Sequence, residues 1–243
     1  MLNEGNGFSA AYARLARAQK GHARGAPAYS VYVNRRIGRA FAALAYSWGM
    51  SPNQVTAVSA IHTFAGIAVL ALAPIEVWSG IVAALLLVAG YAWDSADGQV
   101  ARLRGGGTLA GEWLDHFVDA IKIASLHLAV AVGLFLHAPD LPPQWLLIPL
   151  GYSVVATVTF FGMILNDLLK GARGIPSTHA RGGGTALRSI VLLPTDFGLL
   201  CLVFLAWAWT PLFLVFYGAL FVANTLFLCA AGVKWFREVK AAG

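Results

Sequence analysis

Long apolar stretches separated by short polar breaks dominate the chain from residue 51 onward. Six of them approach or exceed the roughly 20 residues that a helix needs to cross a bilayer. Ser51 and Pro52 form a typical N-cap and first helical position for the first stretch. The expected spans are approximately 52–73, 76–102, 108–136, 144–169, 188–209 and 211–235. The pattern therefore predicts an all-α integral membrane protein, with six transmembrane helices in a domain over residues 51–243.

The sequence before residue 51 is more polar and basic. Residues 1–28 are rich in Gly, Ala and Arg, and no long apolar core precedes position 30, so a cleaved signal peptide is not supported. We expect a flexible basic segment over 1–28, helical near 9–20 and attracted to anionic lipid headgroups. Residues 29–50 combine three arginines with large apolar side chains, which predicts an amphipathic juxtamembrane helix. Such a helix can lie in the membrane interface, pack on the bundle, or do both.

Composition and the placement of charge support a multi-pass protein of the cell membrane. Hydrophobic residues make up 58% of the chain and charged residues only 12%. The net charge of +6 does not indicate a nucleic-acid partner, because Lys and Arg are confined to the N-terminal region, two loops and the C-terminal tail, apart from Lys122. The alternate loops, near residues 75, 140 and 210, contain none. By the positive-inside rule, both termini and the loop that follows residue 102 face the cytoplasm.

One polar stretch, residues 94–119, interrupts the apolar pattern. It holds five of the eleven acidic residues of the chain: Asp94, Asp97, Glu112, Asp115 and Asp119. Carboxylates beside bilayer-length apolar segments are costly and usually face a cavity, a partner or an ion. On helices, the first two aspartates lie about 60° apart on one face and the last two about 40° apart on another. The glycines at 105–107 predict a turn that folds the second helix back on the first.

Four carboxylates brought together repel one another unless a multivalent cation neutralises them. Oxygen ligands suit Mg²⁺, Mn²⁺ or Ca²⁺, and Mg²⁺ commonly acts with phosphates. Arg102 can bind a phosphate oxygen, and the small residues Gly98, Ala101 and Gly111 leave room for a ligand or for close helix approach. The structural alternative is a salt-bridge network that ties two helices together, but too few cations lie nearby in the sequence to pair four carboxylates.

The spacing D-x2-D-G-x2-A-R-x8-G-x3-D-x3-D resembles the signature of the CDP-alcohol phosphotransferase family (class I CDP-alcohol phosphatidyltransferases) at every fixed position. The matching residues are Asp94, Asp97, Gly98, Ala101, Arg102, Gly111, Asp115 and Asp119. Residues 52–56 are similar to the P-N-x-x-T element that opens the first span of these enzymes. Residues 33–37 look similar to the branch that uses CDP-inositol as donor and transfers inositol phosphate.

The resemblance implies a membrane transferase of phospholipid biosynthesis. It would move a substituted phosphate from a CDP-linked alcohol to the hydroxyl of a polar acceptor and release CMP. CDP-diacylglycerol is the favoured donor because phospholipid synthesis is the commonest task in the family. The alternative is a soluble donor such as CDP-inositol with an inositol-phosphate acceptor. Related members also imply a homodimer.

The resemblance also implies roles for individual residues. Asp94, Asp97 and Asp115 would be the principal ligands of Mg²⁺ or Mn²⁺. Asp119 would complete a site for two ions, remain free of metal, or take the proton of the acceptor hydroxyl as general base. The nucleotide would contact Asn53, Thr56, Asp94, Asp97, Gly98, Ala101, Arg102 and Gly111.

The acceptor site has several candidates. Lys122 lies within an expected span, one turn beyond Asp119, and would either pair with that carboxylate or bind the acceptor. Arg173, Arg181 and Arg188 lie in one expected cytoplasmic loop and could hold an acceptor phosphate, or reflect only the topology.

A cation transporter or channel would also place carboxylates within a membrane. Such proteins spread their acids through the depth of the bilayer and often repeat them in two halves. Here the acids lie near one end of two expected spans, and the sequence contains no second copy of the motif. The arrangement favours the enzyme.

Overall fold

The computed structural model describes residues 7–18, 26–175 and 185–242, and within these ranges its regular structure is entirely helical. The all-α membrane class predicted from the apolar pattern is therefore confirmed. Five helices in the described ranges are long and apolar enough to cross a membrane. They are α3 (Pro52–Leu72), α4 (Val77–Leu103), α5 (Leu109–His137), α6 (Leu147–Gly171), which follows the short 3₁₀ helix η2 (Pro143–Leu146), and α9 (Thr210–Ala242).

The segment expected to form a single span over 188–209 is broken into short pieces. It contains α7 (Ala186–Val191), η3 (Leu193–Thr195), α8 (Phe197–Val203) and η4 (Phe204–Ala206). Pro194 cannot donate a backbone hydrogen bond, and Asp196 has an extended backbone while its side chain caps Gly198. The remaining apolar helix, Phe197–Ala206, is shorter than the described spans. The expected number of six transmembrane helices is therefore not confirmed.

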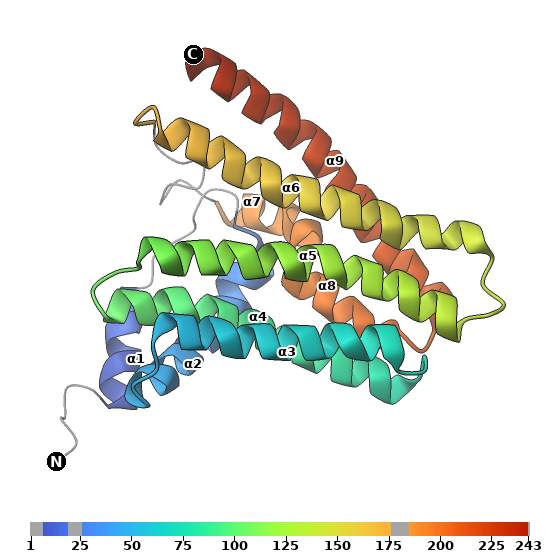
Figure 1. Cartoon of the computed structure of the whole chain (residues 1–243), viewed down its shortest axis with the longest axis horizontal. Coiled ribbons are helices and arrows are strands. Elements are labelled where there is room, and N and C mark those ends of the chain that lie inside the picture. Colours follow the sequence, from blue (N-terminus) through green and yellow to red (C-terminus); the bar gives the residue numbers. More distant parts are fainter. Residues whose placement is uncertain (1–6, 19–25, 176–184, 243) are drawn as a thin grey trace.

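The N-terminal region contributes three shorter helices. They are α1 (Phe8–Arg17), the π-helix η1 (Ser30–Asn34) and α2 (Arg35–Ser47). Helices α1 and α2 lie at the end of the molecule that carries the turn between α4 and α5 (Figure 1). A Cβ on Gly38 of α2 would come within 2.9 Å of the Ser95 side chain, so glycine lets α2 approach α4 closely. The amphipathic segment thus packs directly against the helix that begins the acidic stretch.

Helix α3 packs against both α4 and α5, and the three helices run along the same direction of the bundle (Figure 1). Two glycines allow this close packing. Gly90 of α4 faces Thr63 of α3, and Gly133 of α5 lies against the carbonyl oxygen of Leu70. A Cβ at either position would overlap its neighbour, so these glycines set the distance between the three helices.

The core extends from these three helices to the segments that follow. Gly80 of α4 contacts the backbone of Phe204 and the side chain of Trp207, which brings α8 and η4 against α4. The largest fully buried side chains are aromatic and belong to this region: Phe204, Trp207, Phe213 and Tyr217. Helices α6 and α9 pack on each other, and α6 packs on α5. Their outer surfaces are apolar and exposed, as expected for helices that face lipid.

Candidate active site

A tight turn between α4 and α5 brings the acidic residues of both helices to one end of the bundle. Helix α4 ends at Leu103, and Gly105 and Gly106 adopt positive φ angles of 98° and 138°, which glycine tolerates best. The hydroxyl of Thr108 then accepts a hydrogen bond from the backbone N–H of Gly111 and caps α5. The turn predicted from the glycines at 105–107 thus returns α5 along α4.

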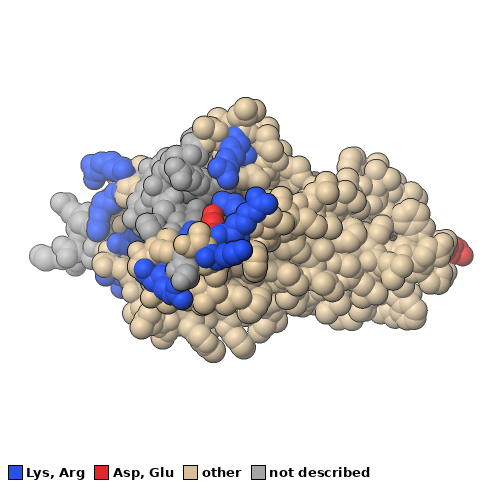
Figure 2. All heavy atoms as spheres, turned by 90° about the horizontal axis from the view of Figure 1, so that it is seen from above, with Lys and Arg blue, Asp and Glu red and all other residues tan. Residues whose placement is uncertain are grey.

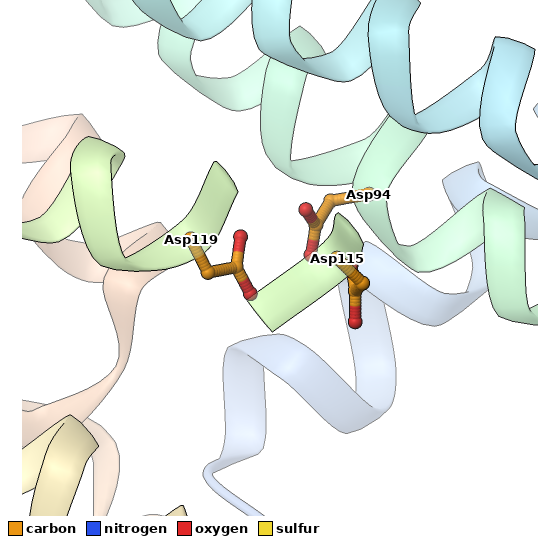
Figure 3. A group of neighbouring side chains, drawn as sticks. All are labelled: Asp94, Asp115 and Asp119. Carbon is orange, nitrogen blue, oxygen red and sulfur yellow. The ribbon is translucent and has the colours of Figure 1, made fainter. Parts of the chain in front are cut away.

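Three of the four motif carboxylates meet beside this turn. Asp94 of α4 and Asp115 and Asp119 of α5 each offer a carboxylate oxygen, and these oxygens lie within 4.8 Å of one another. Figure 3 shows Asp94 on α4 and the two α5 residues around a shared space. All three residues are partly buried. A set of oxygen donors this close together fits a divalent ion such as Mg²⁺ or Mn²⁺.

The fourth carboxylate, Asp97, has different partners. Its Oδ2 accepts a 2.7 Å hydrogen bond from the hydroxyl of Thr56 on α3, and its Oδ1 accepts one from the backbone N–H of Gly98. Asp97 is only 9% exposed. The structure therefore separates the predicted ligands into a group of three and an adjacent Asp97 that is bonded to α3.

A cavity of about 720 Å³ opens next to these carboxylates, between the start of α3 and the α4–α5 turn. Asp97 and Asp115 both line it. So do most of the residues expected to contact a nucleotide: Asn53, Thr56, Gly98, Ala101 and Gly111. The guanidinium of Arg102 lies close to Gly98. A Cβ added to Gly98 would be 3.7 Å from the Nη1 atom of Arg102. Two segments that are distant in the sequence, 51–56 and 97–115, thus form the walls of one cavity.

Arg104 also lines the cavity, although the sequence indicated it only as a basic loop residue. Its Nε donates a 3.1 Å hydrogen bond to the carbonyl of Met50, and its guanidinium lies 5.5 Å from the ring centroid of Tyr46. The guanidinium of Arg14 on α1 lies 6.0 Å from the same ring. Because Tyr46 lies at the end of α2 and Met50 just after it, no spacing within the motif could have identified Arg104.

Lys122 is buried beside the three-carboxylate group, with 6% of its surface exposed. Its Nζ lies 2.6 Å from Asp94 Oδ1 and 3.1 Å from Asp119 Oδ1. It also donates to the hydroxyl of Ser59 on α3 at 3.1 Å. Of the two arrangements expected from the sequence, the structure contains the ion pair with Asp119, and it adds Asp94 as a second partner. Ser59 was not anticipated, although it follows Thr56 by about one helical turn.

Two of the three arginines considered for an acceptor, Arg173 and Arg188, do not line the cavity. Arg173 follows the end of α6 and Arg188 belongs to α7; both are exposed, and neither is among the described residues that line the cavity. Arg181 lies outside the described residues. Figure 2 shows Lys and Arg side chains gathered at the end of the molecule where α1 and α2 lie, and none at the other end of this face.

The fold and the site together define a class, namely a multi-pass membrane protein with an acidic, metal-compatible site next to a cavity. The sequence profile described as CDP-alcohol phosphatidyltransferase matches residues 49–233. The chain therefore belongs to the CDP-alcohol phosphatidyltransferase family and is a CDP-alcohol phosphotransferase. This assignment agrees with the interpretation as an enzyme, which the sequence favoured over a cation transporter or channel.

A solved structure with the same fold supports the assignment of the fold. The crystal structure of the Mycobacterium tuberculosis phosphatidylinositol phosphate synthase PgsA1 with CDP-DAG bound matches with 23% sequence identity and a TM-score of 0.53, over 85% of this chain and 93% of that one. A structure of the same enzyme in complex with manganese and citrate has 23% identity and a TM-score of 0.49, over 85% of this chain and 88% of that one. No curated protein sequence matches the chain.

Proposed function

We propose that this protein transfers a substituted phosphate from CDP-diacylglycerol to the hydroxyl of a polar acceptor and releases CMP. The observation that carries the proposal is the meeting of Asp94, Asp115 and Asp119 next to a cavity lined by other residues of the family motif. A lipid donor is supported by the CDP-DAG bound in the PgsA1 structure, which shares the fold. The apolar surfaces of the surrounding helices give such a donor a membrane environment for its acyl chains.

The carboxylate group fits the divalent ions that the reaction implies. Asp94, Asp115 and Asp119 would hold one Mg²⁺ or Mn²⁺, and Asp97 and Asp115, which line the cavity, would hold a second together with the pyrophosphate of the donor. Divalent metal bound there would supply positive charge for the pyrophosphate and for the departing CMP.

The cavity walls bind the CDP part of the donor. Asn53 and Thr56 present polar side chains from the start of α3, whereas Gly98, Ala101 and Gly111 leave the helix backbones accessible. The guanidinium of Arg102, next to Gly98, binds a phosphate oxygen. In this way the small motif residues provide room, and the arginine provides positive charge.

Asp119 acts on the acceptor. Its carboxylate takes the proton of the acceptor hydroxyl, and the hydroxyl oxygen attacks the phosphorus that bears the donor alcohol. A new P–O bond forms as the bond to CMP breaks, so the donor alcohol and acceptor become joined by a phosphodiester. A phosphorylated acceptor suits Arg173 and Arg188, which are exposed, together with Arg181, which lies between them in the sequence.

The same basic end supports an orientation in the cell membrane. We place the termini and the site on the cytoplasmic side, because Lys and Arg gather there on the surface shown in Figure 2. The homodimer implied by the family resemblance stays a prediction.

The test is CMP release by purified protein with Mg²⁺ or Mn²⁺. Donors are CDP-diacylglycerol and CDP-inositol, and acceptors are inositol, inositol phosphate and glycerol phosphate. We expect metal-dependent release with the lipid donor and one acceptor, and loss of release in Asp119→Asn. The matched control is Asp140→Asn, which changes an exposed aspartate in the α5–α6 connection. Release only with CDP-inositol would select the soluble donor, and absence of both CMP release and CDP binding would refute the proposal.

A further inference from the structure

The ammonium group of Lys122 closes one side of the carboxylate group. Lys122 follows Asp119 on α5, Ser59 follows Thr56 on α3, and Asp94 precedes Asp97 on α4. Lys122, Ser59 and Asp94 therefore form a layer about one helical turn farther from the α4–α5 turn than Asp119, Thr56 and Asp97. This layer is the part of the site that lies deepest in the bundle.

All three hydrogens of the Lys122 ammonium group have acceptors. They are Asp94 Oδ1 at 2.6 Å, Asp119 Oδ1 at 3.1 Å and Ser59 Oγ at 3.1 Å. The hydroxyl of Ser59 in turn donates to the carbonyl of Gly90 at 2.9 Å, which orients its oxygen to accept. A lysine has only three donors. Lys122 has none left for an acceptor substrate, so a role in acceptor binding does not fit.

The same contacts leave room for a metal ion. Each carboxylate has two oxygens and about four acceptor positions, and Lys122 uses one oxygen of Asp94 and one of Asp119. The group of three carboxylates therefore keeps acceptor positions for an ion while Lys122 stays in place. The lysine also fixes the two aspartates relative to each other, although they belong to different helices.

We infer that Lys122 takes the place of a second divalent ion within the carboxylate group, so that the nucleotide-free protein binds one divalent ion and not two. Two divalent ions would supply four positive charges to four motif carboxylates. Lys122 supplies one positive charge permanently. Its ammonium group lies beside Asp94 and Asp119, so a second ion held by these two carboxylates would compete with it. The inference rests on the proposed function, in which the second ion arrives with the pyrophosphate of the donor.

The experiment measures Mn²⁺ binding to the full-length, nucleotide-free protein in detergent, by electron paramagnetic resonance of free Mn²⁺ during titration. We expect one bound Mn²⁺ per chain for the native protein and for Lys122→Arg. Lys122→Met removes the ammonium group while keeping a long side chain, and we expect two bound ions. The matched control is Lys170→Met, because Lys170 is also buried and ion-paired, with Glu238 at 3.2 Å, but lies on α6. It should bind one ion.

A second measurement follows thermal unfolding with and without metal. Without metal, Lys122→Met leaves Asp94 and Asp119 without their counter-ion, and we expect its Tm to fall by about 5–10 °C. Saturating Mn²⁺ should restore most of this loss, because the added ions replace the missing charge. Lys170→Met should also lose stability, but Mn²⁺ should not restore the difference from the native protein.

The outcomes separate this inference from the proposed function. Two ions bound by the native protein would overturn the inference without any variant. One ion bound by both the native protein and Lys122→Met would overturn the inference and leave the metal site intact. No Mn²⁺ binding by the native protein would instead refute the metal site on which both proposals rest.

Discussion

Thr56 on α3 donates a 2.7 Å hydrogen bond to the Oδ2 atom of Asp97 on α4. Both side chains are buried, and 41 positions separate them in the sequence. Each belongs to a different stretch that resembles the family, and both line the same cavity. The hydrogen bond therefore joins the element that opens α3 to the acidic motif of α4.

Thr56→Val should weaken the reaction without unfolding the protein. Valine has nearly the same shape but cannot donate to Asp97, and hydrogen bonds to charged groups contribute about 1.5–3 kcal/mol. We expect kcat/KM for the CDP-linked donor to fall about 10- to 100-fold in the CMP-release assay. Thr159→Val is the matched control, because the hydroxyl of Thr159 donates to the carbonyl of Val155 within its own helix, α6. Equal effects of both variants would contradict the prediction.

Gly38→Ala should loosen the contact between α2 and the motif helix. The new Cβ would lie 2.9 Å from the Ser95 side chain and 3.0 Å from the carbonyl oxygen of Ala92, closer than side chains pack. We expect a loss of about 1–3 kcal/mol of stability, measured as a lower Tm, together with lower activity. Gly171→Ala is the control, since an added Cβ there meets no atom within 4 Å. A Tm for Gly38→Ala at or above that of the control would show that the contact is not tight.

Divalent metal should stabilise the native protein against heat. An ion that binds only the folded state adds about 2.7 kcal/mol when its concentration is 100 times its Kd. We expect Mn²⁺ to raise the Tm by several degrees and EDTA to reverse the shift, which thermal unfolding monitored by tryptophan fluorescence can follow. Asp115→Asn should remove most of the shift, because Asp115 belongs to the three-carboxylate group.

Glu112→Gln is the matched control for that measurement. Glu112 lies one turn before Asp115 and lines the same cavity, but it is not part of the three-carboxylate group. Its substitution should leave the Mn²⁺ shift largely unchanged. An equal loss in both variants would mean that the ion depends on the general negative charge of the cavity.

Asp196→Ala should destabilise the contact between the start of η1 and the start of α8. Asp196 is 2% exposed and accepts hydrogen bonds from the backbone N–H groups of Ser30 at 2.8 Å and Gly198 at 2.9 Å. Alanine leaves both donors without this partner, which costs about 1–3 kcal/mol for each buried group. We expect a Tm at least about 5 °C lower. Asp140→Ala, at an exposed position, should change the Tm little; an equally small change in Asp196→Ala would argue against this double contact.

Local signals in the sequence predicted much of the fold around the site. Ser51 caps α3 and Pro52 is its first residue, as expected, and the glycines near 105 form the turn before α5. These features depend on neighbouring residues, so the sequence contains what is needed to predict them. Helical periodicity likewise placed Asp115 and Asp119 on one face of α5, where both reach the carboxylate group.

Contacts between distant helices could not be predicted in the same way. Lys122 pairs with Asp94, and Asp97 accepts a hydrogen bond from Thr56, because of how α3, α4 and α5 are rotated about their axes. Spacing within a helix does not fix that rotation. Asp196 illustrates the same limit, since its partner Ser30 lies 166 positions away.

The broken segment over 188–209 had a visible cause in the sequence. Pro194 and Asp196 interrupt an otherwise apolar run, and both residues favour the boundary of a helix over its interior. Hydrophobicity averaged over the run concealed this boundary. An interpretation that gave weight to proline and to capping residues would have divided the segment.

Beyond Lys122, α5 continues with Leu126, Val130 and Leu134, all of which are buried in the packed core. The cavity thus opens at the end of the bundle near the α4–α5 turn and is followed by closely packed apolar side chains along α5. Water and ions that enter to serve the reaction meet a dry barrier within the bundle. The enzyme can therefore hold a water-accessible site within a bilayer without offering ions a path along this face of α5.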